Sequence, residues 1–256
     1  MEKKRGISGS TIKIIAILAM LIDHIGAGVV GRYISSTGMP MLDTAEGVRW
    51  LSEYGAWMTL YAVMRMIGRL GFPIFCFLLI EGFEHTRDVK KYAARLLAFC
   101  IISEVPFDLL FRGKVLEFGY QNVFFTLFIG LLVLCVYRYV EQQEEWNVLW
   151  KAFCYLAALI AGMAVAELLH TDYAAIGVCC ILVLYIFRKN KVGQIVAGCI
   201  VFLWELTAPL AFLPIAFYNG KRGLKMKYFF YIFYPAHLLI LYLICVAAGI
   251  SGFAAM

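Results

Sequence analysis

Charged residues are scarce in this sequence: Asp, Glu, Lys and Arg make up 16% of its 256 residues, against about 25% in soluble proteins. Hydrophobic residues reach 63% and the mean hydropathy is +0.82, an excess that only a chain solvated by lipid can carry. A membrane-spanning helix needs about 20 apolar residues, so several such helices would use most of the chain. The composition therefore leaves no room for a separate soluble domain and predicts one transmembrane domain over residues 1–256.

Several functional motifs are also absent. The sequence has no HExxH motif for a zinc protease and no GxxxxGK[ST] loop for nucleotide phosphates. Its eight cysteines lie inside apolar runs and form no CxxC pair, which argues against a zinc site or a disulfide framework. The net charge of +6 comes mainly from short loops between apolar runs, a pattern of membrane topology rather than of nucleic-acid binding. We therefore expect neither a metal ion nor a nucleic-acid partner.

The apolar runs predict an all-α bundle of about nine transmembrane helices. Their ranges are 12–32, 57–82, 93–111, 121–139, 147–168, 173–188, 192–204, 206–218 and 228–250. The seventh and eighth runs are short, so a hairpin centred on Pro209 that only partly crosses the membrane is an alternative. Basic residues alternate between loops, which places the N-terminus in the cytoplasm and the C-terminus outside. A short interfacial helix would fit in the first outer loop, 33–56.

The first apolar run follows a basic N-terminus and so resembles a signal peptide. The charged pair Asp23-His24 stands where a cleavage site would follow the apolar core, which is atypical and favours an uncleaved first helix. The small residues Gly26-Ala27-Gly28 keep cleavage open as an alternative.

Charged and titratable residues inside the predicted spans need an explanation, because a charge at the bilayer centre costs about 2.5–3.5 kcal/mol on insertion scales. They are Asp23, His24, Arg65, Arg69, Glu104, Asp108 and His237. At a rise of about 1.5 Å per residue, helices one, two, three and nine each bring one of them close to the bilayer centre. These helices are therefore expected to meet around a polar site.

Two pairs of these residues have helical spacing. Arg65 and Arg69 are four residues apart on helix two, and Glu104 and Asp108 are four residues apart on helix three. Because the two helices are antiparallel neighbours, the sequence predicts that the arginines face the carboxylates. Two interpretations remain open: an ion-pair network that fixes helix packing, or a site where one of the four side chains meets a substrate.

His24 has the clearest catalytic pattern. It neighbours Asp23 at mid-depth, where an imidazole is an effective general base. We expect His24 to be catalytic and Asp23 to orient it. For His237, and for Asn122 at the outer start of helix four, structural and functional interpretations have equal weight. Other polar residues are expected at the solvated outer rim: Glu167, His170, Asp172 and Glu205.

Four stretches carry a family resemblance. They are 13–26 (KIIAILAMLIDHIG), 66–111 (with IGRLGFPIFCFLLIEGFEHTRDVKKYAARLL and ISEVPFDLLF), 121–132 (QNVFFTLFIGLL) and 228–241 (YFFYIFYPAHLLIL). Together they resemble the TraX family, whose conjugative-plasmid members acetylate the N-terminus of F-type pilin. The first two stretches are specific, the last is shared with multi-pass membrane acyltransferases in general, and residues 145–218 match by hydropathy only. In those wider relatives a first-helix histidine is thought to act at the transfer centre, and Asp23 and His24 match that position.

The resemblance implies an acyltransferase of the bacterial cytoplasmic membrane. Acetyl-CoA or another acyl-CoA would enter from the cytoplasm, and an amine or hydroxyl of a small molecule, a glycan or a peptide N-terminus would accept the acyl group at or beyond the outer face. The CoA phosphates would meet the basic inner rim, where the candidates are Lys90, Lys91, Arg95, Lys221 and Arg222. Arg65 or Arg69 would stabilise the thioester oxyanion or hold an acceptor carboxylate. The basic rim has membrane topology alone as its alternative interpretation.

Two other function classes fit the same residues. A proton- or ion-coupled transporter or channel would use Glu104, Asp108 and His24 as a relay. A non-enzymatic assembly or scaffold protein is the third possibility.

Overall fold

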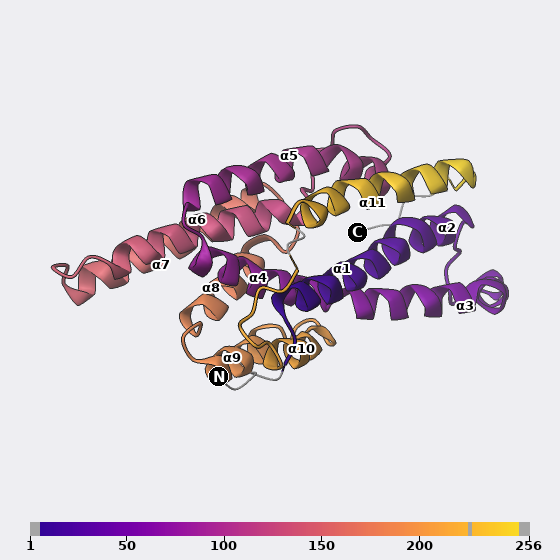
Figure 1. The fold of residues 1–256 in the computed structure, drawn as a ribbon. Coiled ribbons are helices and arrows are strands. Elements are labelled where there is room, and N and C mark those ends of the chain that lie inside the picture. The colour runs from indigo at the N-terminus through magenta and orange to yellow at the C-terminus, as the bar shows by residue number, and fades with distance from the viewer. Residues whose placement is uncertain (1–5, 225–226, 251–256) are drawn as a thin grey trace.

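The structure is a computed structural model that describes residues 6–224 and 227–250. Within these ranges the chain is helical without a β-strand, as the predicted all-α class requires. Figure 1 shows two staggered groups of long helices: α1, α2, α3 and α11 extend to one side, and α6 and α7 extend to the other. Five helical stretches in the described part are long and apolar enough to cross a membrane. The chain is therefore a helical membrane protein.

The first of these stretches is a continuous helix in three parts. They are α1 (Gly9–Ile25), the π-helical segment η1 (Gly26–Val30) and α2 (Gly31–Ser36). Ser8 caps α1, because its side chain accepts a hydrogen bond from the backbone N–H of Thr11. The π-helical segment begins two residues after His24, and such segments are frequent at functional sites. Gly26 brings this segment close to α3, since a Cβ there would lie 2.9 Å from the Cβ of Met64.

The second stretch is longer than the predicted span 57–82. It consists of α3 (Ala45–Gly68) and α4 (Gly71–His85). The two helices form one run of 41 residues, with a break at Arg69 and Leu70. The interfacial helix expected in the loop 33–56 is instead the first part of α3. Hydropathy missed this extension because charged residues at positions 46, 49 and 53 interrupt the apolar pattern.

The next two helices are α5 (Val89–Arg112) and α6 (Val123–Glu141). Asp88 accepts a hydrogen bond from the backbone N–H of Lys91 at the start of α5, and this bond, with the Lys91 side chain, lowers the pKa of Asp88. After α5 the chain folds back into the bundle. Asn122, the residue that caps α6, donates a hydrogen bond of 2.9 Å to the carbonyl oxygen of Cys100 in the middle of α5. Helix α6 therefore begins at mid-length of α5.

The region of the fifth to eighth predicted spans contains one long helix, one shorter helix and a short hairpin. Its elements are α7 (Val148–Leu168), α8 (Ala174–Ile186), α9 (Lys191–Val201), the 3₁₀ turn η2 (Ala208–Ala211) and α10 (Phe212–Ala216). At about 1.5 Å per residue, α10 covers about 7 Å and cannot cross a bilayer core of about 30 Å. The prediction of a complete eighth span is therefore wrong, and the alternative of a partial hairpin agrees with the structure. Gly198 lets α10 pack on α9, because a Cβ there would lie 2.2 Å from the ring of Phe212.

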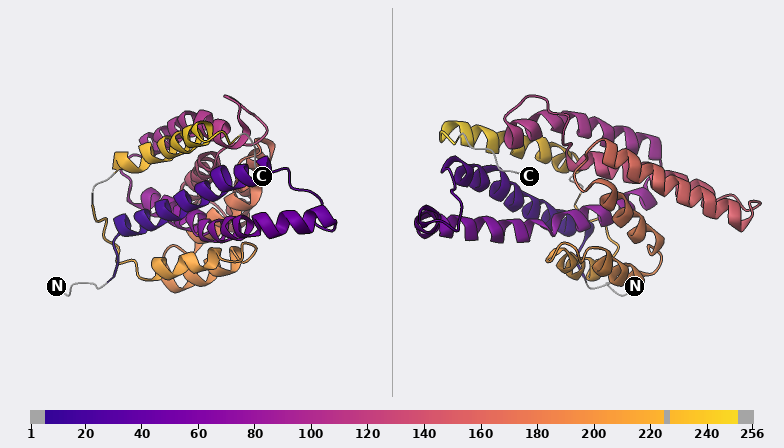
Figure 2. Two further views of the ribbon diagram at one scale, coloured as in Figure 1. Left: turned by 90° about the vertical axis from the view of Figure 1, so that its right-hand side faces the viewer. Right: turned by 180° about the vertical axis from the view of Figure 1, so that it is seen from behind.

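The last helix, α11 (Lys227–Ala247), packs along α5 and also contacts α1. Figure 2 shows α11 beside α5 from two further sides. One buried apolar cluster fills the space between α4, α6 and α8, and a second one, which includes Ile17, Phe107 and Leu238, joins α1, α5 and α11. Large apolar side chains such as Leu149 and Phe153 of α7 also cover the outside. Lipid, rather than water, solvates such a surface.

Candidate active site

Two histidines that are 213 residues apart in the sequence meet between α1 and α11. The Nδ1 atom of His24 lies 2.7 Å from the Nε2 atom of His237. Their rings are parallel within 3° and their centroids are 5.0 Å apart, which fits an in-plane hydrogen bond between two imidazoles. His237 is buried, with 5% of its surface exposed, and His24 is partly exposed. The two residues were separate candidates in the sequence, and the fold makes them a pair.

A backbone carbonyl sets the direction of the hydrogen bond between the histidines. The Nδ1 atom of His237 lies 2.7 Å from the carbonyl oxygen of Phe233, and a carbonyl only accepts, so this Nδ1 carries the proton. In a neutral imidazole the Nε2 atom of His237 then accepts, and the donor is the Nδ1–H of His24. The Nε2 atom of His24 therefore keeps its lone pair. It makes no hydrogen bond within the part of the chain that the structure describes.

Aromatic rings enclose the histidine pair. The His24 ring meets Phe111 of α5 and Tyr234 of α11 edge to face, with centroid distances of 5.6 and 5.8 Å. The ring of Phe233 stacks on His237 at 4.8 Å. The ring of His24 thus faces the interior of the bundle, between α5 and α11, and not the lipid.

Asp23 has a different partner from the one predicted. Its Oδ2 atom accepts a hydrogen bond of 2.6 Å from Arg65 of α3. Its Oδ1 atom lies against the backbone of the same helix, where a Cβ on Gly68 would be 1.9 Å away. Consecutive helical residues point about 100° apart, so Asp23 faces α3 while His24 faces α11. The predicted orientation of His24 by Asp23 is therefore wrong, and His237 takes that place.

Arg69 pairs with the tip of the α9–α10 hairpin. Its guanidinium lies 2.6 Å from the Oε1 atom of Glu205, whose side chain is 5% exposed. The hydroxyl of Thr207 donates a hydrogen bond of 2.6 Å to the carbonyl of Met66, in the last turn of α3. Glu205 was expected at a solvated rim, and this expectation is wrong because its side chain points to Arg69 of α3 and is buried there.

Both carboxylates of α5 are buried. The Oε2 atom of Glu104 accepts hydrogen bonds from the backbone and side-chain N–H groups of Asn122. The Oδ2 atom of Asp108 accepts a hydrogen bond of 2.7 Å from the backbone N–H of Glu117. Each carboxylate keeps one buried oxygen, Oε1 and Oδ1 respectively, without a partner among the described residues. Asn122 thus caps α6 and also donates hydrogen bonds to Glu104.

The predicted cluster of two arginines facing two carboxylates is not formed. Arg65 pairs with Asp23 and Arg69 with Glu205, whereas Glu104 and Asp108 bind amide groups. The physical reason lies in the packing order of the helices. Helix α3 packs on α1 and η1, and α5 packs on α11 and α6. The arginines of α3 and the carboxylates of α5 therefore belong to different packing groups, with α4 between the two helices in the sequence.

The sequence analysis did not predict the polar contact between the loops that follow α5 and α7. The hydroxyl of Tyr120 donates a hydrogen bond of 2.7 Å to Asp172, which was expected at a wet rim. Backbone hydrogen bonds of 2.9 Å also join Gln121 to His170 and to Asp172, so the loops after α5 and α7 fold together. The surrounding protein shields Asp172 from water and raises its pKa. No sequence signal marks this contact, because the two loops are about 50 residues apart.

The predicted donor-binding residues divide into two groups. Arg95 interacts with the hydroxyl of Tyr231, and Arg222 lies within electrostatic range of Lys13, whose ammonium stands 5.3 Å from the ring of Phe230. Lys13 and Arg95 therefore lie beside the first turns of α11, and Arg222 lies near Lys13. Lys13 is an addition to the predicted set, since the sequence pattern counted it only as a topological charge.

The remaining three lysines lie further out. Lys90 and Lys91 are exposed at the start of α5, and Lys91 pairs with Asp88 at 3.3 Å. Lys221 is exposed on the segment whose carbonyl groups accept hydrogen bonds from Gly9 and Ser10 at the start of α1. The basic rim thus has two parts: a group of three cations close to the start of α11, and three exposed lysines further from it.

The comparison with known proteins decides the family. The sequence profile described as "TraX protein" matches residues 8–245. The chain belongs to the TraX family. The resemblance seen in the four sequence stretches is thereby confirmed.

Two relatives of this TraX-family chain are informative. The "Probable fimbrial assembly protein FimC, serogroup H1" of Dichelobacter nodosus is 28% identical over 267 residues, which cover 94% of this chain and 97% of that protein. The "Uncharacterized protein RP591" of Rickettsia prowazekii (strain Madrid E) is 22% identical over 180 residues, which cover 70% of this chain and 56% of that protein. No solved structure matches the chain.

Proposed function

We propose that this TraX-family protein is a membrane-embedded acyltransferase. It moves an acyl group, acetyl by family resemblance, from cytoplasmic acyl-CoA to an amine or hydroxyl at or beyond the outer face of a bacterial cytoplasmic membrane. The observation that carries the proposal is the histidine pair inside the bundle. The hydrogen bonds of His237 leave the Nε2 atom of His24 with a lone pair, as a general base requires.

The proposed step needs one proton acceptor. Nε2 of His24 removes the proton from the acceptor amine or hydroxyl while its nitrogen or oxygen attacks the thioester carbonyl carbon. The carbon–sulfur bond then breaks, the acyl group stays on the acceptor, and His24 returns the proton to the thiolate of CoA. While His24 is positively charged, its Nδ1–H still donates to Nε2 of His237, so the pair stabilises the cation.

The donor is proposed to bind at the first turns of α11. Lys13, Arg95 and Arg222 gather there, and cations in such a group suit the phosphates of CoA. From Lys13 to His24 the distance along α1 is about 16 Å. Ile17 and Met20 pack along this path, so these apolar side chains move when the acyl chain enters.

Arg65 and the carboxylates of α5 have proposed supporting roles. Arg65 uses one terminal nitrogen for Asp23, and its other N–H groups remain candidates for the thioester oxyanion. Asp23 is then a positioning residue that holds Arg65. The name of the Dichelobacter relative favours a protein acceptor, so a peptide N-terminus is the first acceptor to test.

The decisive experiment uses the full-length protein reconstituted in liposomes. Radiolabelled acetyl-CoA is mixed with a panel of amines, sugars and peptides, and transfer is measured by scintillation counting. We expect His24→Ala to lower the rate about 10²–10⁴-fold, the usual contribution of a general base, without loss of CoA binding or thermal stability. His85→Ala is the matched control, because the His85 side chain is 72% exposed at the end of α4. Full activity of His24→Ala would refute the assignment.

His237 is tested by a pair of substitutions. Gln places a carbonyl oxygen where Nε2 of His237 accepts its hydrogen bond, whereas Ala leaves Nδ1 of His24 without an acceptor. We expect His237→Ala to lower kcat about 10–100-fold at unchanged KM, and His237→Gln to recover part of the loss. Equal losses for both variants would contradict a positioning role.

A proton- or ion-coupled transporter is the second candidate function. The observation in its favour is the pair of buried carboxylate oxygens on Glu104 and Asp108 that lack partners among the described residues. Calorimetry with acetyl-CoA and a proton-flux assay in liposomes separate the two functions. Absence of CoA binding together with substrate-driven flux would favour the transporter, and absence of both would favour an assembly role.

A further inference from the structure

Five charged side chains meet where α1, the end of α3, the α7–α8 loop and the tip of the α9–α10 hairpin come together. They are Asp23, Arg65, Arg69, Asp172 and Glu205. Two of the carboxylates form the ion pairs of 2.6 Å described above, and both guanidiniums also lie within electrostatic range of Asp172. The three carboxylates lie within electrostatic range of one another. These side chains therefore form one group, which we call the five-charge cluster.

The five-charge cluster contains one carboxylate more than guanidiniums. With every group ionised, one negative charge is uncompensated, and a buried charge without a partner is costly. Two carboxylate oxygens, Oδ1 of Asp23 and Oε2 of Glu205, are buried without a hydrogen-bond partner among the described residues. The Glu205 side chain is 5% exposed and so is shielded from bulk water. The balance of charge needs a proton on one carboxylate or a bound cation that donates hydrogen bonds.

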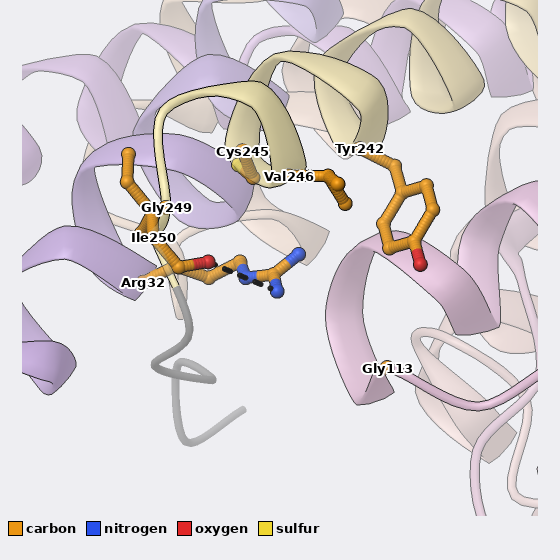
Figure 3. Close-up of a pocket in the computed structure, with 7 residues that line it drawn as sticks. All are labelled: Arg32, Gly113, Tyr242, Cys245, Val246, Gly249 and Ile250. Atoms are coloured by element: carbon orange, nitrogen blue, oxygen red, sulfur yellow. Dashed lines mark hydrogen bonds between the residues drawn. The ribbon is translucent and has the colours of Figure 1, made fainter.

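The arrangement of the carboxylates favours an ammonium over a metal ion. Within the described ranges, no three carboxylate, imidazole or thiol groups are placed as ligands of one metal ion. An ammonium carries its own N–H donors and can bind a single carboxylate oxygen. A cavity of about 390 Å³ at the ends of α2, α5 and α11 has the opposite charge, because the guanidinium of Arg32 lines it (Figure 3). Electrostatic attraction therefore directs a cationic ligand to the five-charge cluster and not to this cavity.

The five-charge cluster is accessible and lies next to the histidine pair. The side chains of Arg65 and Arg69 are 25% and 37% exposed, so a ligand can approach the cluster from outside the protein. Asp23 directly precedes His24 on α1, and Arg65 lies within electrostatic range of His24. The cluster and the histidine pair therefore occupy adjacent faces of α1, about 100° apart around the helix axis.

We propose that Glu205 binds the ammonium of an amine acceptor and removes its first proton. This inference rests on the proposed acyl transfer. An ammonium nitrogen has no lone pair with which to attack the thioester, so one proton must leave before the transfer and a second one during it. Oε2 of Glu205 takes the first proton, and the neutral amine, which its charge no longer holds, moves around α1 to Nε2 of His24. His24 takes the second proton and returns it to the thiolate of CoA. Ammonium and acyl-CoA thus give an amide, the thiol of CoA and one proton, which leaves from Glu205.

The first measurement compares two peptides that differ in one group. Gly-Gly-Gly-amide carries an ammonium at neutral pH, and glycolyl-Gly-Gly-amide carries a hydroxyl in the same position. Their Kd values are measured by calorimetry with the full-length protein in detergent and saturating CoA. We expect the ammonium peptide to bind at least about tenfold more tightly, because its hydrogen bonds to a carboxylate are charge-assisted. Equal Kd values, or no binding of the ammonium peptide, would overturn the ammonium site whether or not acyl transfer occurs.

Variants of Glu205 test which carboxylate binds the ammonium. In Glu205→Gln we expect the two peptides to bind equally, and in Glu205→Asp we expect a smaller preference for the ammonium peptide, since the carboxylate remains but stands one methylene further back. Glu53→Gln, which removes an exposed carboxylate of α3, is the matched control and should keep the full preference. A full preference in folded Glu205→Gln would contradict the assignment. If Glu205→Gln does not fold, Glu205→Asp decides, because an unchanged preference there would equally contradict direct binding.

Transfer rates separate this proposal from the acyl transfer itself. With radiolabelled acetyl-CoA and the protein in liposomes, Glu205→Gln should lower kcat/KM for Gly-Gly-Gly-amide more than for glycolyl-Gly-Gly-amide, because only the ammonium has to lose a first proton. Equal losses for both peptides would indicate a structural role of Glu205 and overturn the proposal. Transfer to no acceptor at all, with the binding preference retained, would refute the acyl transfer and leave cation binding at Glu205.

Discussion

Substitution of Gly68 by alanine tests the closest approach between α1 and α3. A Cβ on residue 68 would lie 2.3 Å from the Cβ of Asp23 and 1.9 Å from its Oδ1 atom. Carbon atoms in contact are normally about 3.5–4.0 Å apart, so the two helices must separate by about 1 Å or more. That movement lengthens the 2.6 Å contact between Arg65 and Asp23. Asp23 directly precedes His24 in the sequence.

The expected loss of stability combines three contributions. Overpacking of a close contact costs about 1–3 kcal/mol. A broken ion pair adds to it, but less than the roughly 3–5 kcal/mol of a fully buried pair, because the Arg65 and Asp23 side chains are 25% and 18% exposed. The higher helix propensity of alanine relative to glycine offsets about 0.5–1 kcal/mol of this loss of stability. We expect a net destabilisation of about 2 kcal/mol, or about 4–8 °C in Tm for a chain of this size.

The assay is thermal unfolding of the purified full-length protein in detergent, followed by a maleimide dye. The dye reports unfolding because Cys76 and Cys100 are fully buried. Gly55→Ala is the matched control on the same helix, where the nearest atom to a new Cβ is Leu51 Cδ1 at 3.6 Å. Its Tm should rise by about 1–4 °C. If Gly68→Ala also melts at or above the unmodified protein, α1 and α3 do not approach as described and the reasoning fails.

Three other substitutions test individual contacts of the bundle. Glu205→Gln removes the charge that faces Arg69 and should lower the Tm in the same assay; an unchanged Tm would mean that the hairpin tip is not held by this pair. Tyr120→Phe removes the hydroxyl bound to Asp172 and should cost about 1–3 kcal/mol, because a shielded acceptor loses its partner; a cost near zero would contradict the contact between the two loops. For Asp88→Ala the pH dependence is the test: the pKa of Asp88 is lowered in the folded state, so its contribution is complete above the ordinary value of 3.8 and is lost as the pH falls through the lower, folded value. The Tm difference from the unmodified protein should therefore shrink on acidification, and a difference that grows would be inconsistent with capping of α5.

Much of the fold could be predicted from local patterns. Hydropathy located helices in every predicted span, and the TraX resemblance followed from short stretches around His24, residues 66–111 and His237. The same patterns failed where single polar side chains point into the bundle. Gln121, Asn122 and Glu205 belong to segments that resemble outer loops, yet their side chains are buried. Hydropathy reports the average environment of a segment and not the direction of one side chain.

The sequence by itself determined that lipid surrounds this protein, where its helices lie, and which residue types are available for chemistry. These are properties of single segments, since hydropathy and periodicity act over a few turns. Only the tertiary structure decided which polar groups meet: His24 with His237, Asp23 with Arg65, and Arg69 with Glu205. Partner choice depends on helix rotation and packing order, and a rotation of 100° from one residue to the next is enough to give neighbouring residues different partners.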